Sequence, residues 1–313
     1  MLTPSLRLFV SSSLASSAAL ARDIKLSHSV FALPFGLLGM ALAAASAGRW
    51  PTPGELLLVL ACMVTARTFA MTVNRVADAG FDAQNPRTAG RAIPAGRLSA
   101  AFAGGAIVVS AVLFVAAAAG FWFLRGNLWP VALALPVLGW LALYSFTKRF
   151  TAWCHVVLGV ALAVSPVAAA LAVEPAYAAT PGPWLLAGFV AGWVAGFDVL
   201  YALADREVDA RLGLRSVPAR FGAGGAVAVS RALHALAFLS LAGLNLAEPR
   251  LGPLFAGATT LALALLLCEQ WLVRGGRLER LGTAFLTVNG VLGLLLGVAG
   301  VAEALRGVGA TAG

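Results

Sequence analysis

Three polar side chains recur at four-residue intervals just after a long apolar run: Asn74, Asp78 and Asp82. In an α-helix this spacing places them in one column on the same face. Oxygen-bearing side chains are the ligands that Mg²⁺ prefers, and the segment that follows supplies Arg87 and Arg91. Carboxylates beside cationic side chains suit a polyphosphate held through Mg²⁺, so this window predicts part of such a site.

A second window of carboxylates follows another apolar run more than a hundred residues later. If residues 198–209 form one α-helix, Asp198, Asp205 and Asp209 also share a narrow face. Asp198 lies two turns inside the apolar run, where an ionised Asp costs ~3 kcal/mol or more and is usually functional. One such column alone would be interpreted as a solvated helix end with ordinary salt bridges.

The composition indicates which elements must position these windows. Of 313 residues, 60% are hydrophobic and 11% are charged, whereas a soluble globular chain carries about 25% charged residues. The solvent that suits this composition is a lipid bilayer, and we expect one all-α membrane domain over residues 1–313. The net charge of +9 is spread through short breaks between apolar runs, which argues against nucleic-acid binding.

Apolar runs long enough to span a bilayer recur along the whole chain. They predict nine transmembrane helices, at roughly 28–47, 55–73, 101–120, 129–146, 153–173, 183–203, 224–245, 252–273 and 281–303. Residues 1–25 are expected to form a cytoplasmic segment with an interfacial helix.

The distribution of Lys and Arg predicts the orientation. With the N-terminus inside, sixteen of them fall on the inner side, against Arg49, Arg125, Arg250 and Arg306 on the outer side. This asymmetry predicts a multi-pass protein of a bacterial inner membrane with a cytoplasmic N-terminus. Both carboxylate windows then lie at inner ends of spans, each followed by a basic loop. We therefore expect one site in which Mg²⁺ bridges the carboxylates and a diphosphate.

The two windows resemble the NDxxDxxxD and DxxxD motifs of the UbiA superfamily of intramembrane aromatic prenyltransferases. The resemblance extends over most of the chain through residues 22–25 (RDIK) before 31–35 (FALPF), 85–88 (NPRT) with 94–96 (PAG), 144–150 (YSFTKRF) and 213–218 (GLRSVP). The chain departs from the first motif at Arg75, where the family has Asp.

This resemblance implies a set of metal ligands in the two windows. Asn74, Asp78 and Asp82 would bind one Mg²⁺, Asp205 and Asp209 would bind the other, and Asp198 matches a further acidic position beside them. The resemblance also makes the four carboxylates Asp78, Asp82, Asp205 and Asp209 the expected catalytic residues.

Cationic and aromatic side chains would complete the site. Lys148, Arg149 and Arg87 would bind the diphosphate, although Lys148 and Arg149 also fit a purely topological role. Arg67, two turns before Asn74, would orient an anionic aromatic acid or the phosphate, or form a structural ion pair. Tyr201 would stabilise a cation through its ring, or only pack.

Other polar residues carry weaker signals. Arg22 and Lys25 are interpreted as interfacial anchors, with contact to the cavity as the alternative. His28, His155 and His234 are isolated and lack metal-ligand spacing, so we interpret them as hydrogen-bonded helix residues.

The expected reaction is Mg²⁺-dependent transfer of a polyprenyl group from polyprenyl diphosphate to an aromatic acid. The leading acceptor is 4-hydroxybenzoate, prenylated ortho to its hydroxyl in ubiquinone biosynthesis; the alternative is a dihydroxynaphthoate of menaquinone biosynthesis. A cation- or proton-coupled transporter is the alternative of another class, but it would spread ionisable residues across the bilayer. A CDP-alcohol phosphotransferase would carry a DGxxAR-type signature, which this sequence lacks.

Overall fold

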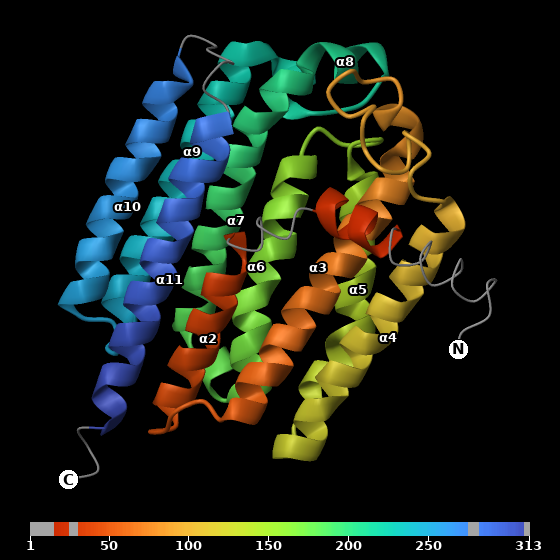
Figure 1. Ribbon diagram of the computed structural model, residues 1–313. Coiled ribbons are helices and arrows are strands. Elements are labelled where there is room, and N and C mark those ends of the chain that lie inside the picture. Colours follow the sequence, from red (N-terminus) through yellow and green to blue (C-terminus); the bar gives the residue numbers. More distant parts are fainter. Residues whose placement is uncertain (1–15, 25–30, 275–281, 310–313) are drawn as a thin grey trace, which may run out of the picture.

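The computed structural model describes residues 16–24, 31–274 and 282–309. In these ranges the chain is helical, without β-strands, and its long helices run side by side (Figure 1). The expected positions Lys25 and His28, and most of the segment 1–25, lie outside the described residues.

The main helices follow the apolar runs. They are α2 (Leu33–Ser46), α3 (Pro53–Asp82), α4 (Ala100–Arg125), α5 (Trp129–Thr147), α6 (Cys154–Val173), α7 (Pro181–Tyr201), α8 (Arg206–Arg211), α9 (Val217–Ala247), α10 (Pro253–Leu272) and α11 (Asn289–Arg306). Eight segments are long and apolar enough to cross a membrane, and α2 is a shorter apolar helix. The prediction of an all-α membrane bundle of about nine helices is confirmed.

Local sequence signals explain several helix ends. Thr52 and Glu55 form a reciprocal capping box at the start of α3, which also has Pro53 in its first turn. Ser99 and Ser216 cap α4 and α9 by accepting a backbone hydrogen bond. These caps satisfy backbone groups that the ends of a helix leave unpaired.

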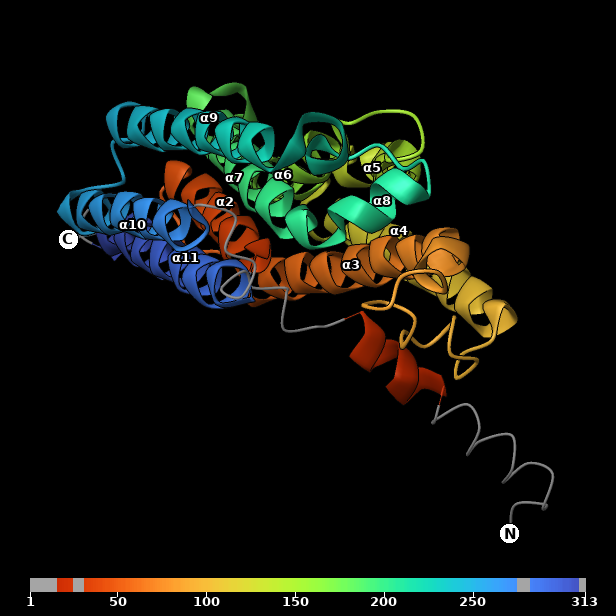
Figure 2. The same ribbon diagram turned by 90° about the horizontal axis from the view of Figure 1, so that it is seen from above.

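The core lies where α2, α6 and α7 pack together. Trp193 of α7 is fully buried and its ring stacks on Phe189 at 5.7 Å between centroids. Gly159 of α6 lies against the backbone of Ala191, so any side chain at this position would collide with α7. Small residues allow such close approach between membrane helices. Seen from above, α2, α6 and α7 lie between the other helices, with α4 and α10 towards opposite ends (Figure 2).

The bundle has two chemically different ends. The end of α3 and the segment from α7 to α8 lie together at the top of Figure 1, which we call the carboxylate end. The start of α3, the turn from α4 to α5 and the end of α6 lie at the bottom, which we call the opposite end.

Candidate functional site

The first window occupies the last turns of α3, which runs past the predicted end of its span to Asp82. Asp78 and Asp82 are only 3% and 6% exposed. The side-chain amide of Asn74 donates a hydrogen bond of 3.1 Å to Asp78 Oδ2, as the four-residue spacing allows. The column is therefore turned into the protein.

The second window is not one continuous α-helix, and that expectation was wrong. The helix α7 ends at Tyr201, a 3₁₀ segment (η3) covers Ala202–Asp205, and α8 begins at Arg206. A 3₁₀ turn contains three residues instead of 3.6, so one helical wheel does not relate Asp198 to Asp205. Both side chains still reach the same cavity.

The two windows meet around a cavity of about 240 Å³ at the carboxylate end. All six predicted metal ligands line it: Asn74, Asp78, Asp82, Asp198, Asp205 and Asp209. The cavity wall also includes Lys148, Arg87 and Tyr201. Residues more than a hundred positions apart in the chain thus face one cavity.

Cationic side chains form ion pairs with the carboxylates of the first window. Lys148 Nζ lies 2.7 Å from Asp78 Oδ2. Arg91 Nη1 lies 2.8 Å from both carboxylate oxygens of Asp82. Arg91 also lines the cavity but was predicted only as part of a basic loop, because nothing in its spacing shows that the loop folds back on α3.

The same loop reaches the second window. Arg87 Nε donates 2.8 Å to Asp205 Oδ1 and its Nη2 pairs with the other oxygen, while Asn85 Nδ2 donates 2.9 Å to Oδ1. The Arg87 guanidinium also lies 5.4 Å from the ring centroid of Tyr201. Burial lowers the pKa of Arg87, but the Asp205 carboxylate outweighs burial and raises this pKa above its usual value. Arg87 therefore remains a cation.

His155 is a hydrogen-bonded helix residue, as the sequence indicates, but it also lines the cavity, which was not predicted. Its Nδ1 lies 2.6 Å from Asp198 Oδ2, and its Nε2 lies 3.4 Å from the backbone nitrogen of Val217. The buried imidazole thereby connects α6 with α7 and with the start of α9. A single histidine at the start of an apolar run carries no spacing signal that reveals this contact.

Arg149 does not line the cavity, unlike its neighbour Lys148. Its guanidinium donates 2.6 Å to the carbonyl of Ala77 and lies over the rings of Phe81 and Phe146, at 5.5 and 4.9 Å from their centroids. These contacts hold the loop after α5 against the last turns of α3.

Two arginines of α3 instead contact the N-terminal helix at 16–23. Arg67 Nη2 donates 3.0 Å to the carbonyl of Ile24. Arg75 is buried, lies 3.5 Å from an Asp23 oxygen and donates 3.0 Å to Asn74 Oδ1. Neither arginine lines the cavity. Arg75, at which the chain departs from the family motif, is therefore paired with Asp23 and donates a hydrogen bond to the side-chain oxygen of Asn74.

The donor chemistry of the cavity suits Mg²⁺. Asp78 Oδ1 is buried and has no hydrogen-bond partner among the described residues, which is the kind of oxygen that a cation would satisfy. Within the same residues, however, no three acidic, His or Cys side chains are grouped closely enough to hold a metal by themselves.

Comparison with known proteins gives a consistent picture. The family model of the UbiA prenyltransferase family matches residues 32–302. The 4-hydroxybenzoate octaprenyltransferase of Tolumonas auensis is 33% identical over 82% of this chain and 86% of its own length. The protein of the same name from Idiomarina loihiensis is 33% identical over 82% and 87%, respectively.

Solved structures show the same architecture. The apo structure of a UbiA homolog from Aeropyrum pernix K1 has a TM-score of 0.78 and 30% identity, covering 88% of this chain and 97% of that one. The UbiA homolog from Archaeoglobus fulgidus bound to GPP and Mg²⁺ has a TM-score of 0.69 and 18% identity, with coverages of 91% and 99%.

Proposed function

This chain belongs to the UbiA prenyltransferase family, and on that premise we propose that it transfers a polyprenyl group from polyprenyl diphosphate to 4-hydroxybenzoate. The observation that carries the proposal is the single cavity in which both carboxylate windows meet, with Lys148, Arg87 and Arg91 in its wall. The names of the relatives support the acceptor. Because the chain belongs to a family of prenyltransferases, we no longer retain the transporter as an alternative function.

The carboxylates and cations have complementary roles towards the diphosphate. Asp78, Asp82, Asp205 and Asp209, with Asn74 and Asp198, would hold Mg²⁺, which when bound neutralises the diphosphate and favours its departure. The Mg²⁺-bound structure of the Archaeoglobus fulgidus homolog supports this cofactor. Lys148, Arg87 and Arg91 would exchange their carboxylate partners for phosphate oxygens, which bind Lys and Arg strongly.

The reaction replaces one bond to the allylic carbon by another. The bond from this carbon to the diphosphate oxygen breaks, and its electron pair leaves with diphosphate. The ring carbon ortho to the hydroxyl of 4-hydroxybenzoate then donates an electron pair to the allylic cation and loses its proton. Tyr201 lines the cavity and would face the cation with its ring.

The membrane position suits both substrates. We place the carboxylate end at the cytoplasmic face of a bacterial inner membrane, because the Lys and Arg excess of the sequence lies on this side. The isoprenoid chain then stays in lipid while the diphosphate and the aromatic acid reach the cavity from the cytoplasm. Residues 1–313 form one membrane domain in this proposal.

The direct test incubates membranes that contain the protein with Mg²⁺, a polyprenyl diphosphate and either 4-hydroxybenzoate or a dihydroxynaphthoate. Prenylated 4-hydroxybenzoate, detected by mass spectrometry, is the expected product. Asp78→Asn and Asp205→Asn should abolish it, whereas Glu207→Gln should not, since the Glu207 side chain is 90% exposed at the same end. Product only from the naphthoate would replace the acceptor, and no product from either would refute the proposal.

A further inference from the structure

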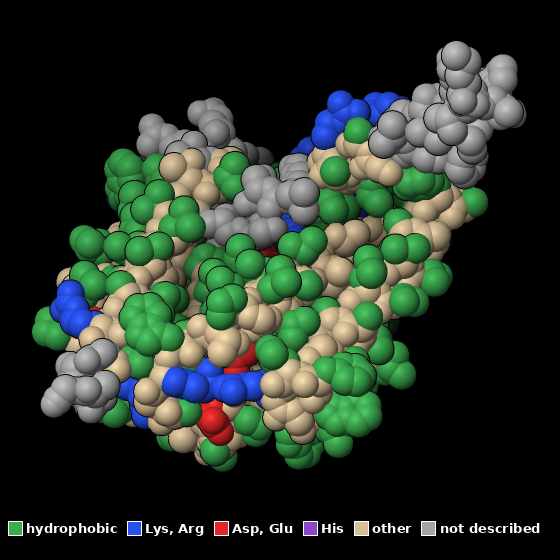
Figure 3. All heavy atoms as spheres, turned by 60° about the horizontal axis from the view of Figure 1, so that its bottom comes forward, with side chains coloured by type: hydrophobic (Ala, Val, Ile, Leu, Met, Phe, Trp, Pro, Cys, Tyr) green, Lys and Arg blue, Asp and Glu red, His purple; other side chains and the backbone are tan. Residues whose placement is uncertain are grey.

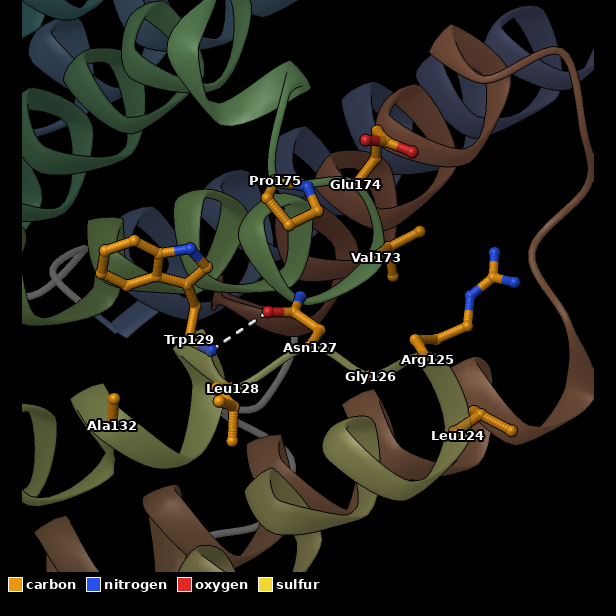
Figure 4. A pocket seen from close by; sticks show the side chains of 10 residues that line it. All are labelled: Leu124, Arg125, Gly126, Asn127, Leu128, Trp129, Ala132, Val173, Glu174 and Pro175. Carbon is orange, nitrogen blue, oxygen red and sulfur yellow. Dashed lines mark hydrogen bonds between the residues drawn. The ribbon is translucent and has the colours of Figure 1, made fainter.

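A second and larger cavity lies at the opposite end of the bundle. It has a volume of about 1060 Å³ and is formed by the end of α4, the turn to α5 and the residues that follow α6 (Figure 4). The 30 residues of α3 separate this end from Asp82, which corresponds to about 45 Å of helix. The proposed reaction therefore makes no use of this cavity.

The wall of the second cavity is held in place by Asn127. Its side-chain nitrogen donates 2.8 Å and 3.0 Å to the carbonyls of Leu171 and Ala172. Its side-chain oxygen accepts 3.0 Å from the backbone nitrogen of Trp129, which is the dashed line in Figure 4. Gly126 ends α4 with a positive φ of 68°, a conformation that favours glycine. The turn is thus fixed to α6.

Two guanidinium groups at this cavity share a single carboxylate. Glu55 is fully buried and accepts hydrogen bonds of 2.8 and 2.9 Å from Arg49, and Arg125 Nε lies 2.9 Å from the same carboxylate. One carboxylate thus neutralises one of two guanidinium groups. The three side chains together keep one positive charge, and Arg125, which is 33% exposed, is the member of this cluster that lines the cavity.

An anion lies in the same wall. Glu174 directly follows α6 and lines the cavity, and within the described part of the chain no hydrogen bond or ion pair engages its carboxylate. Other carboxylates at this end are engaged: Glu248 pairs with Arg250, and Glu303 accepts from the backbone of Phe255. The cavity therefore offers one positive and one negative group.

The surroundings place this cavity at the level of lipid headgroups. Trp129 in its wall is exposed, as are three other tryptophans at this end, Trp50, Trp122 and Trp184. Exposed tryptophans gather at the interface between membrane and water. Leu124 and Leu128 also line the cavity and are exposed. Figure 3 shows this end with its few charged side chains set among hydrophobic ones.

We propose that this cavity binds a zwitterionic phospholipid with a primary amine, a phosphoethanolamine headgroup, in the leaflet opposite the carboxylate end. The phosphate contacts Arg125, the ammonium donates hydrogen bonds to Glu174, and the acyl chains follow the exposed leucines. A phosphoglycerol headgroup lacks the cation that Glu174 requires. A phosphocholine headgroup has the right charges but no N–H group to donate.

The test measures lipid binding to the purified full-length protein by native mass spectrometry. Phosphatidylethanolamine, phosphatidylcholine and phosphatidylglycerol with identical acyl chains serve as probes. We expect phosphatidylethanolamine to bind about tenfold more tightly than phosphatidylcholine, the effect of one charge-assisted hydrogen bond. Glu174→Gln should remove this preference, and Glu207→Gln at the carboxylate end should retain it.

Three results would overturn the lipid site. They are equal binding of the ethanolamine and choline lipids, tighter binding of the glycerol lipid, and a preference that survives in Glu174→Gln. Arg125 is kept intact in this experiment because it also holds Glu55, so a folding defect does not confuse the result. The readout is independent of prenyl transfer, so the outcome does not depend on the proposed function.

Discussion

Replacing Lys148 by Gln separates the structural role of the cavity cations from their chemical role. Lys148 Nζ lies 2.7 Å from Asp78 Oδ2, and the two side chains are 27% and 4% exposed. The variant leaves a buried carboxylate without its cation, while Asp78 Oδ1 already lacks a hydrogen-bond partner among the described residues. We therefore expect both stability and turnover to fall.

The magnitude of the stability loss follows from burial. Breaking a fully buried ion pair costs about 3–5 kcal/mol. Because Lys148 is 27% exposed, water partly screens the pair, and we expect a loss of ~2 kcal/mol. This corresponds to ~4 °C in the unfolding temperature of a chain of this size. Loss of a charged phosphate contact should lower kcat/KM by about 100-fold.

The assay compares Lys148→Gln with the double variant Lys148→Gln/Asp78→Asn. Removing the carboxylate charge as well should restore most of the unfolding temperature, measured in detergent, but should abolish prenyl transfer. A double variant as unstable as the single one would show that the unpaired carboxylate is not the cause. Unchanged kcat/KM in Lys148→Gln would refute the assigned phosphate contact.

Three further substitutions test other parts of the structure. Arg149→Gln should change the KM for polyprenyl diphosphate less than about threefold, whereas Arg87→Gln should raise it at least ~10-fold. The reason is that Arg87 lines the cavity and Arg149 does not. Equal effects of the two substitutions in steady-state kinetics would contradict this. His155→Leu should lower kcat by about tenfold, and His155→Gln should lower it less, because the Gln amide can still donate a hydrogen bond to Asp198. Equal kcat values in the two variants would show that His155 does not orient Asp198. Glu55→Gln should lower the unfolding free energy by ~2 kcal/mol in thermal denaturation, because two guanidinium groups lose their carboxylate. The same variant should keep its KM, since Glu55 lies at the opposite end.

The elements that depend on local pattern and solvent were predictable from the sequence. Apolar runs predict the long helices because only a helix satisfies its backbone within lipid. The four-residue spacing of Asn74, Asp78 and Asp82 predicts their shared face because α3 continues as a regular helix to Asp82. For these features the sequence of a single segment is enough to determine its structure.

The rest of the site depends on contacts between segments that are distant in the chain. The 3₁₀ segment at 202–205 has helix-forming residues, so its local sequence gives no signal of a break. Arg91 folds back on Asp82, and His155 meets Asp198 across two helices. Lys148 and Arg149 are adjacent, yet only Lys148 enters the cavity because the end of α5 directs the two side chains differently. Tertiary packing determines all of these contacts.

The ion pairs within the cavity also bear on the release of product. Each of three cations in the wall has a carboxylate within pairing distance: Lys148 with Asp78, Arg91 with Asp82 and Arg87 with Asp205. If these cations bind diphosphate as proposed, they would return to the carboxylates when inorganic diphosphate departs and would not be left uncompensated in the site. Re-forming the pairs offsets part of the cost of releasing a multiply charged product. The arrangement would thereby weaken inhibition by the diphosphate product.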